Sequence, residues 1–246
     1  ILENIHEQTL LPPLHAGWAM RRKTNHFASY DEVVKKFAKM VEIDPWMLNP
    51  FFAKVTDVNF DEGTGLEALM STVDTILSKI KKKYKEYGIK EKPFVIVKAN
   101  AGTCGMGIMT VRDSREVLEL NAKQKNKMTV VKDGRAVRDF IVQEGVYTFE
   151  QIDETVAEPV VYMIDRYVVG GFYRVHQDRS VDENLNAPGM EFVPLAFAQQ
   201  HAVPDMRAKP GTAAPNRFYM YGVVARSALL AASLELEKTD PHPEIY

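Results

Sequence analysis

Residues 93–111 read Pro-Phe-Val-Ile-Val-Lys-Ala-Asn-Ala-Gly-Thr-Cys-Gly-Met-Gly-Ile-Met-Thr-Val. The apolar run at 94–97 has the length and residue types of a buried strand. Lys98 follows at the end of this run, and glycines at 102, 105 and 107 crowd into the next positions. A second apolar run at 108–111 predicts another strand. The stretch therefore predicts a β-hairpin with a glycine-rich loop and a lysine at its entrance.

This hairpin has the features of a phosphate-binding loop. Glycines let a backbone approach a ligand closely and turn its N–H groups toward an anion. A lysine beside the loop neutralises a phosphate as a point charge. In a Walker loop the lysine follows the glycines, and a dinucleotide fingerprint opens a helix, so neither motif fits. The alternative is a plain hairpin whose glycines only make the turn, and the loop alone leaves both interpretations open.

The composition is that of a folded protein with a sizeable core. The chain has 246 residues, of which 46% are hydrophobic and 26% charged, and its formal net charge is −2. These values exclude intrinsic disorder and do not suggest a nucleic-acid surface. The single cysteine excludes an internal disulfide and suits the cytoplasm, and no apolar run approaches the roughly 20 residues of a membrane span. Because the sequence begins without methionine and in mid-pattern, we expect it to be a fragment.

The first 90 residues predict a partly helical region. The basic cluster at 21–23 is either a solvated surface or an anion-binding site, and the sequence leaves both open. Ser29 and Glu32 have the spacing of a capping box, so we expect a helix from there to about position 42. Apolar residues at helical spacing over 66–80 predict a second helix, with Gly88 as its C-cap.

Beyond the hairpin, short strands and helices are expected. Asp113, with Glu116 three residues later, predicts a capped helix. The further expected elements are strands over 128–132, 140–146, 158–165 and 168–176, of which the last two form an antiparallel pair, a strand after position 190 that runs to 197, and a helix over 223–236. Residues 199–215 have no apolar period and predict a mobile loop. The pattern as a whole is that of an α+β fold.

In this order the segments resemble the ATP-grasp superfamily over roughly residues 94–236. The resemblance implies two α+β subdomains that hold ATP between them, a small lid at 91–136 and a large subdomain at 137–246, after the partly helical region 1–90. Adenine would be bound through the backbone carbonyl of Glu144 and the N–H of Val146, and ribose by the carboxylate of Glu150. The implied ATP-binding residues are Lys98, Gly102, Thr103, Gly105, Met106, Gly107, Gln143, Glu144, Gly145, Val146 and Glu150.

Further motifs resemble the proteobacterial ATP-grasp type of glutamate–cysteine ligase across nearly the whole chain. The shared stretches are Pro-Pro-Leu-His-Ala-Gly-Trp at 12–18, Arg-Arg-Lys at 21–23, Asp-Pro-Trp at 44–46, Val-Lys-Ala at 97–99 with the glycine loop, Gln-Glu-Gly-Val at 143–146, Ala-Glu-Pro-Val-Val-Tyr-Met-Ile-Asp at 157–165 and Val-Val-Gly-Gly-Phe-Tyr-Arg at 168–174. The resemblance implies an enzyme that uses ATP and Mg²⁺ to join the γ-carboxylate of L-glutamate to L-cysteine through an acyl phosphate. That reaction is the first step of glutathione biosynthesis.

The resemblance also implies roles in catalysis and substrate binding. Lys98 would act on the ATP phosphates, and Arg174 would hold the acyl phosphate, which suits a planar guanidinium. The implied substrate-binding residues are Arg21, Arg22, Lys23, Arg174 and Asn184. ATP-grasp enzymes usually hold Mg²⁺ with an acid and a Glu-x-Asn after an Asn-Leu loop, which the stretch at 184–186 resembles, but no such strand follows position 197. Either the metal ligands lie in an N-terminal part that is absent, or Glu183 and Asn186, the nearest candidates, serve.

Two other function classes stay open at the level of sequence. One is a different ATP-grasp carboxylate–amine ligase, glutathione-synthetase-like or acting on another amino acid, and the other is a nucleotide-binding module without catalysis. His176 is expected to be a structural histidine rather than a base. Cys104 is expected to be a small residue tolerated in the loop rather than a nucleophile. Small-molecule substrates are the expected partners, without nucleic acid or membrane, and the sequence leaves the oligomeric state open.

Overall fold

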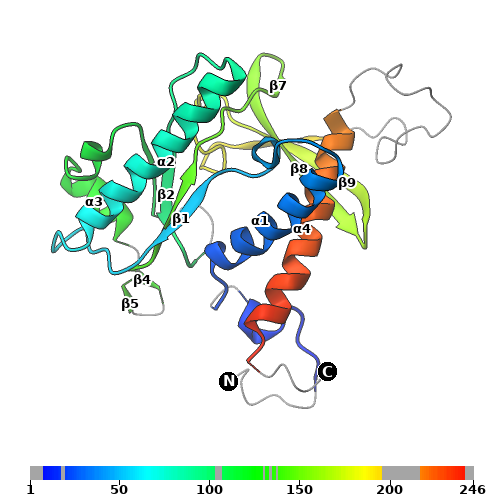
Figure 1. Cartoon of the computed structure of the whole chain (residues 1–246), viewed down its shortest axis with the longest axis horizontal. Coiled ribbons are helices and arrows are strands. Elements are labelled where there is room, and N and C mark those ends of the chain that lie inside the picture. Colours follow the sequence, from blue (N-terminus) through cyan, green and yellow to red (C-terminus); the bar gives the residue numbers. More distant parts are fainter. Residues whose placement is uncertain are drawn as a thin grey trace. The chain divides into compact units, whose positions relative to one another are not determined.

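The computed structural model of the chain describes residues 8–17, 20–102, 107–129, 131–132, 135–136, 138–195 and 217–241. Contacts divide the chain into two compact units, drawn in the ribbon of Figure 1. The first comprises residues 1–146 and 232–246, and the second comprises residues 147–231. The three-part division expected from the sequence, with boundaries after 90 and 136, stays a prediction.

The first unit contains an antiparallel sheet of four strands in the order β1-β6-β2-β3. β2 (Val95–Ala99) and β3 (Ile108–Val111) form the predicted hairpin, in which Lys98 pairs with Ile108. β6 (Phe140–Glu144), also predicted, lies on the other side of β2. β1 (Phe52–Val55) flanks β6 and is a strand that the sequence did not indicate, because four residues give too short an alternation.

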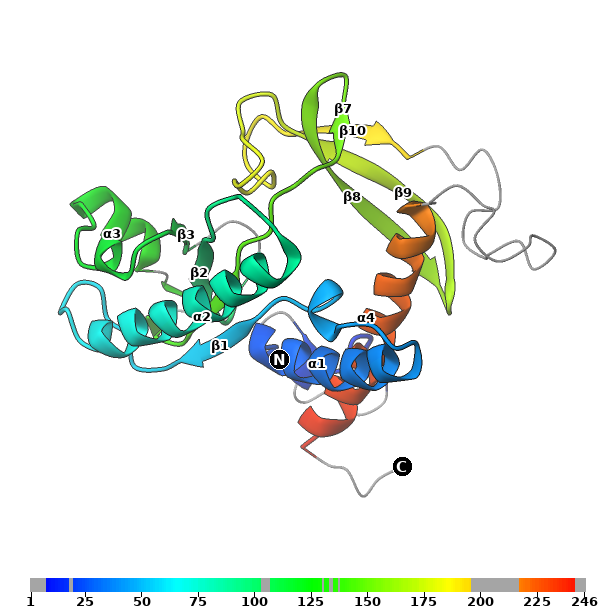
Figure 2. The ribbon, with the colours of Figure 1, turned by 45° about the horizontal axis from the view of Figure 1, so that its top comes forward.

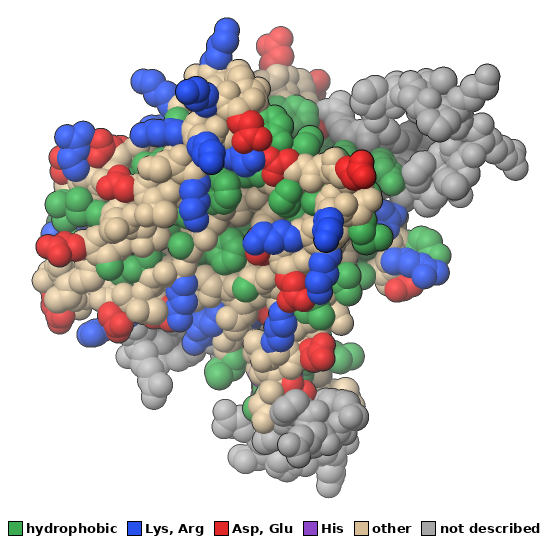
Figure 3. Space-filling view, in the orientation of Figure 1, with side chains coloured by type: hydrophobic (Ala, Val, Ile, Leu, Met, Phe, Trp, Pro, Cys, Tyr) green, Lys and Arg blue, Asp and Glu red, His purple; other side chains and the backbone are tan. Residues whose placement is uncertain are grey.

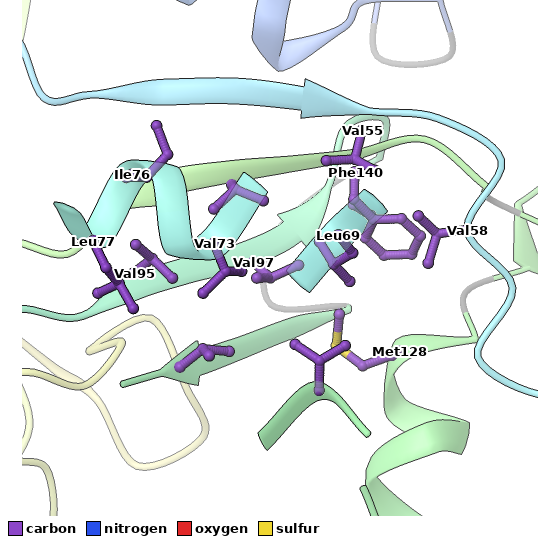
Figure 4. Close-up of a cluster of buried hydrophobic side chains, with 14 of the residues drawn as sticks. Val55, Val58, Leu69, Val73, Ile76, Leu77, Val95, Val97, Met128 and Phe140 are labelled. Carbon is purple, nitrogen blue, oxygen red and sulfur yellow. The ribbon is translucent and has the colours of Figure 1, made fainter. Parts of the chain in front are cut away.

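The helix α2 (Leu66–Tyr87) packs along this sheet (Figures 1 and 2). Its apolar residues recur every three or four positions and meet the inward side chains of β2 and β6 in one buried cluster (Figure 4). The cluster includes Leu69, Val73, Ile76, Ile80, Val95, Val97 and Phe140. Gly88 ends the helix in the left-handed conformation, with φ 68°, which confirms the predicted C-cap.

The helix α1 (Lys23–Met40) begins earlier than the sequence indicated. Ser29, the predicted cap, is buried inside the helix, so that prediction was wrong. The first two N–H groups of the helix are instead satisfied by Asn100, the residue that follows β2. Lys23 N–H donates to Asn100 O and Thr24 N–H to Asn100 Oδ1, both at 2.9 Å. A cap supplied by a segment so distant in sequence has no local signature.

The rest of the first unit consists of short elements. The capping box of Asp113 and Glu116 is confirmed, but it caps a 3-10 turn, η4 (Ser114–Val117). The strand predicted over 128–132 is only partly present, because Met128 ends a helix. The remaining short elements are η2 (Leu14–Ala16), η3 (Pro45–Met47), α3 (Ala122–Met128) and the paired strands β4 (Val131–Lys132) and β5 (Arg135–Ala136).

The second unit is built on a long antiparallel pair, β8 (Thr155–Ile164) and β9 (Tyr167–Val175), which confirms the predicted pair (Figure 2). The register shifts between Tyr162, which pairs with Gly170, and Met163, which pairs with Val168, so the ladder contains a β-bulge here. β10 (Glu191–Pro194) flanks β9, and β7 (Gln151–Ile152) flanks β8.

The long helix α4 (Arg217–Thr239) contains the helix predicted over 223–236, and its residues belong to the second unit up to Ala231 and to the first from Ala232. Helices together with antiparallel sheets confirm the α+β class. Lys and Arg side chains alternate with Asp and Glu over the face drawn in Figure 3. Within the described ranges, every helix is too short or too polar to cross a membrane. The predicted loop at 199–215 lies outside the described residues.

Candidate functional site

Lys98 lies near the end of β2, on the opposite face of the sheet from the core. Successive side chains of a strand point to opposite faces, so Val97 is in the core cluster and Lys98 is not. The Lys98 ammonium lies 5.7 Å from the centre of the Phe27 ring of α1, within the range of a cation–π contact. Among the residues that the structure describes, Lys98 has no acidic partner. Burial, and then the charge of Lys23, lower the pKa of Lys98 to about 8.

The loop that follows Lys98 depends on glycine at both described ends. Gly102 has φ 91° and Gly107 has φ 60°, a region that other side chains rarely adopt. Gly107 O accepts a hydrogen bond from Ala99 N–H at 3.1 Å, which closes the hairpin. Three predicted ATP contacts, Thr103, Gly105 and Met106, lie outside the described residues, as does Cys104.

Lys23 reaches the first half of the same loop. Its ammonium donates to three backbone carbonyls, those of Ala99 at 2.8 Å, Gly102 at 3.2 Å and Ala101 at 3.3 Å. An ammonium has three N–H donors, so these contacts match its donor capacity. The structure thus brings two of the predicted site residues, Lys23 and Gly102, into direct contact.

Arg21 pairs with an acid of α4, whereas Arg22 binds a backbone carbonyl. Arg21 Nε and Nη2 donate to the carboxylate of Glu235 in α4, at 2.9 and 2.7 Å. His26 Nδ1 lies 3.0 Å from the same carboxylate, which is almost fully buried. The hydrogen bond with Glu235 raises the pKa of Arg21, whereas burial lowers the pKa of His26. Arg22 Nη1 donates to Met20 O at 2.7 Å. An anionic substrate would therefore meet Arg21 only by displacing Glu235.

Glu144, at the end of β6, has a side chain that is part of the protein's own framework. Both of its carboxylate oxygens accept from Trp46 Nε1 at 3.0 Å, and Oε2 also accepts from the Phe51 N–H at 2.9 Å. Its backbone N–H donates to Phe51 O at 2.7 Å. Glu144 is only 3% exposed, and burial raises the pKa of its carboxyl. These contacts hold the carboxylate and the end of β6 against Trp46 and Phe51.

The other residues of the predicted hinge lie in different surroundings. Gln143 Oε1 is buried and has no hydrogen-bond partner among the described residues. Gly145 N–H donates to Phe94 O at 2.9 Å, and a Cβ at Gly145 would lie 2.0 Å from the Phe94 ring, so no larger residue fits. Val146 is 65% exposed. The three residues therefore differ in environment, and Val146 is the most accessible of them.

In the second unit, Glu150 is buried beside a tyrosine. It is 4% exposed and accepts a hydrogen bond from the hydroxyl of Tyr221 in α4. Burial, and then this hydrogen bond, raise the pKa of Tyr221. A ribose hydroxyl bound at Glu150 would therefore share the carboxylate with Tyr221.

Arg174 lies on β9 directly opposite Glu158 of β8, and its Nη1 donates to the Glu158 carboxylate. Its Nε is buried and has no hydrogen-bond partner among the described residues. The nearby His176 is satisfied at both nitrogens, because Nε2 lies 3.0 Å from Pro188 O and Nδ1 accepts from the Asp178 N–H at 3.2 Å. These contacts support the structural role expected for His176.

The predicted metal ligands lie in the loop before β10. Glu183 Oε1 accepts from Arg179 Nη1 at 2.8 Å, and Oε2 accepts from the Ser180 N–H at 2.9 Å. The bond with the Ser180 backbone is the main reason that the pKa of Glu183 is lowered. Asn184 Oδ1 accepts from the Asn186 N–H at 3.1 Å. The described ranges contain no group of three or more His, Cys, Asp or Glu side chains able to hold a metal ion.

Sequence reasoning missed the partners of the predicted residues. These are Phe27 beside Lys98, Asn100 at the loop, Glu158 beside Arg174 and Tyr221 beside Glu150. Glu158 had a detectable signal, because oppositely charged residues that face each other on a predicted antiparallel pair attract. The others approach from distant parts of the chain and leave no local pattern.

Comparisons with known proteins agree on one family. The family model described as glutamate-cysteine ligase matches residues 1–236. A crystal structure from Methylobacillus flagellatus KT, of a protein assigned provisionally as a gamma-glutamylcysteine synthetase, is 60% identical and has a TM-score of 0.83. The match covers 95% of this chain and 55% of that chain, so this chain spans about half the length of its solved relative. The search of curated proteins gave no match.

Proposed function

Because the chain belongs to the glutamate–cysteine ligase family, we propose that it takes part in joining the γ-carboxylate of L-glutamate to the amine of L-cysteine with ATP. A carboxylate is too poor an electrophile for an amine to attack directly. Transfer of the γ-phosphoryl group to it gives an acyl phosphate, and the amine then displaces inorganic phosphate. The protein's task is to position the reactants and to neutralise charge on the transferred group.

The observation that carries this proposal is the environment of Lys98. Its ammonium is desolvated beside the glycine loop, and no acid among the described residues compensates its charge. A buried cation without an anion is unfavourable, and a bound phosphate would remove that penalty. Lys98 would hold the phosphates of ATP, and the loop that begins after Ala99 would present backbone N–H groups to them.

The other nucleotide contacts are proposed at residues whose surroundings suit them. Adenine would bind the backbone carbonyl of Glu144 and the N–H of Val146, supported by the fixed strand end and the exposure of Val146. Ribose would bind the carboxylate of Glu150. Arg174 would hold the acyl phosphate, and the buried Nε that lacks a partner among the described residues supports a ligand there.

The remaining proposals concern the glutamate carboxylates and the metal. Arg22 and Asn184 are proposed for the carboxylates of glutamate, and Arg21 would join them if Glu235 exchanged its partner. The family's chemistry calls for Mg²⁺ with ATP. The described residues do not form a site for Mg²⁺, because both carboxylate oxygens of Glu183 accept hydrogen bonds from Arg179 and Ser180. We therefore assign no step of the reaction to the metal. Cysteine must react as a free thiol-bearing amine, which fits the reducing cytoplasm.

The test is release of inorganic phosphate from Mg-ATP by the protein with L-glutamate, with and without L-cysteine, together with detection of γ-glutamylcysteine. Glutamine is the matched control substrate, because it carries an amide in place of the γ-carboxylate that must be phosphorylated. We expect phosphate release with glutamate and cysteine and none with glutamine. Release with another acid or amine would indicate a different ligase. Binding of ATP without turnover with any amino acid would indicate a nucleotide-binding module.

A further inference from the structure

We propose that Lys23 is a positioning residue of the nucleotide site: its ammonium ties down the first half of the glycine loop and thereby sets the direction of the loop amides next to Lys98. Its importance for ATP rests on the proposed function. The tie itself is a property of the protein without nucleotide. The resemblance implied instead that Lys23 binds the substrate glutamate, so the two roles of Lys23 are alternatives.

The first support is the way that the start of α1 is joined to the loop. Asn100 is fully buried, and it accepts the N–H groups of Lys23 and Thr24 while its Nδ2 donates to Thr24 Oγ1 at 3.0 Å. Its own N–H donates to Asp139 O at 2.9 Å. The backbone of Lys23 is thus held against the residue that begins the loop, and the side chain has only a short distance to span.

The second support is the set of acceptors around the Lys23 ammonium. The carbonyls of Ala99, Ala101 and Gly102 converge on it within 3.3 Å, so the backbone turns around the ammonium. In a trans peptide the N–H of the next residue points away from the carbonyl. Gathering the Ala101 carbonyl on the side of Lys23 therefore directs the Gly102 N–H to the other side. N–H groups turned outward from a loop are what an anion requires.

The third support is the contrast between the two lysines. The donors of Lys23 point at carbonyls, which leaves little capacity for a substrate carboxylate. Lys98 has no such acceptors among the described residues. The charge of Lys23 also helps to lower the pKa of Lys98, so the two ammonium groups are electrostatically coupled. The chain therefore holds one lysine by its own backbone and keeps the other near the loop.

The first arm of the test uses the full chain without nucleotide. Lys23→Met removes the donors, Lys23→Arg keeps a charge but cannot aim three donors at one point, and Lys39→Met is the control on the exposed side of the same helix. Two quantities are measured: amide hydrogen exchange over 99–102, and the pKa of Lys98 from the pH dependence of its acylation, followed by mass spectrometry. We expect exchange at least tenfold faster in both Lys23 variants. The pKa of Lys98 should rise in Lys23→Met and stay near its present value in Lys23→Arg.

The second arm measures Mg-ATP affinity and the KM for glutamate in the same variants. We expect at least tenfold weaker ATP binding in both Lys23 variants with an unchanged KM for glutamate. A raised KM for glutamate with normal ATP affinity would overturn the proposal in favour of a substrate contact. Exchange in both Lys23 variants equal to that of Lys39→Met would overturn the tie itself. If the wild-type protein bound no ATP, the proposed function would fail, and the first arm would still decide the tie. If Lys23→Met failed to fold, Lys23→Arg would carry both arms.

Discussion

Lys98 in the first unit and Arg174 in the second are both cations proposed to act on phosphate, yet their surroundings differ. Arg174 faces Glu158 across two paired strands and is already compensated without a ligand. Lys98 faces an aromatic ring, and no acid among the described residues pairs with it. A cation that pairs with an acid of the protein is accounted for by that ion pair. A buried cation that has no such acid indicates that an anionic ligand binds beside it. Lys98 is therefore the stronger indication of a phosphate site.

The contrast between Lys98 and Arg174 is tested most strongly by Lys98→Met, for which we expect the largest loss of turnover. The substitution keeps an apolar stem of similar length and removes the charge. Loss of a preorganised partner of the transferred group costs about 3 kcal/mol, roughly a hundredfold in turnover. Because the buried charge has no acidic partner in the described structure, melting without nucleotide should occur at or above the wild-type temperature. Turnover by phosphate release and melting by calorimetry are the two measurements.

The control for Lys98→Met is Lys39→Met, which removes a lysine from the exposed side of α1 and should change neither quantity. Near-normal turnover in Lys98→Met would remove Lys98 from the mechanism. The glycine hairpin would then be a structural turn, and the contrast with Arg174 would lose its functional meaning.

A slightly smaller effect, on stability, is expected from Glu144→Ala. Glu144 is the opposite case to Lys98, because its buried carboxyl accepts hydrogen bonds from Trp46 and Phe51 of the protein itself. The substitution leaves Trp46 Nε1 and the Phe51 N–H without an acceptor, and unsatisfied buried donors cost about 1–3 kcal/mol each. We expect the free energy of unfolding in urea to fall by about 2–3 kcal/mol, against no change in the exposed control Glu62→Ala. A stability like that of the control would show that the contacts with Trp46 and Phe51 contribute nothing.

These environments also show what the sequence could and could not predict. The hairpin and the α2 core were predictable because apolar runs and helical spacing are local, and so was the cap at Gly88. The start of α1 was not, because its cap is Asn100, 76 positions away from Thr24. The resemblance marked Lys98 as a candidate through its ammonium and Glu144 through its backbone carbonyl. Only the fold shows that Trp46, 98 positions away, binds the side chain of Glu144, and that no acid among the described residues pairs with Lys98.

The next effect is the pH dependence that an uncompensated Lys98 should confer. Its pKa is lowered to about 8 from 10.5, so the free protein loses the positive charge as the pH rises through about 8. We expect Mg-ATP affinity to fall about tenfold between pH 7 and pH 9, because binding must then take up a proton. Lys98→Arg, which stays charged, is the matched control and should show a flat profile in isothermal titration. A pH-independent affinity in the wild type would contradict a phosphate contact by Lys98.

The same lowered pKa has a consequence for stability without nucleotide. Between pH 8 and about 10.5 the unfolded chain binds more protons at Lys98 than the folded chain does. The contribution of Lys98 to the free energy of unfolding therefore rises with pH across this window, being least favourable below pH 8. The difference between wild type and Lys98→Met in urea unfolding should shrink over the same range.

The smallest effect is expected at the compensated pair itself. Arg174 and Glu158 have side chains that are 21% and 36% exposed, so solvent screens their attraction. A cycle of Arg174→Met, Glu158→Gln and the double variant should give a coupling of about 0.5–1 kcal/mol in the free energy of unfolding. Cross-strand pairs of opposite charge contribute in this range.

Turnover in Glu158→Gln sharpens the comparison further. Glutamine keeps the shape of Glu158 and removes the charge that now neutralises Arg174, so Arg174 would become an uncompensated cation like Lys98. If Glu158 only neutralises Arg174 until a phosphate arrives, turnover should stay within about threefold of wild type and the KM for ATP should not rise. A large loss of turnover at unchanged stability would show that Glu158 itself acts on the reactants. Arg174 and Glu158 would then both belong to the functional site. An ion pair in the ligand-free protein would therefore not indicate that a cation is only structural.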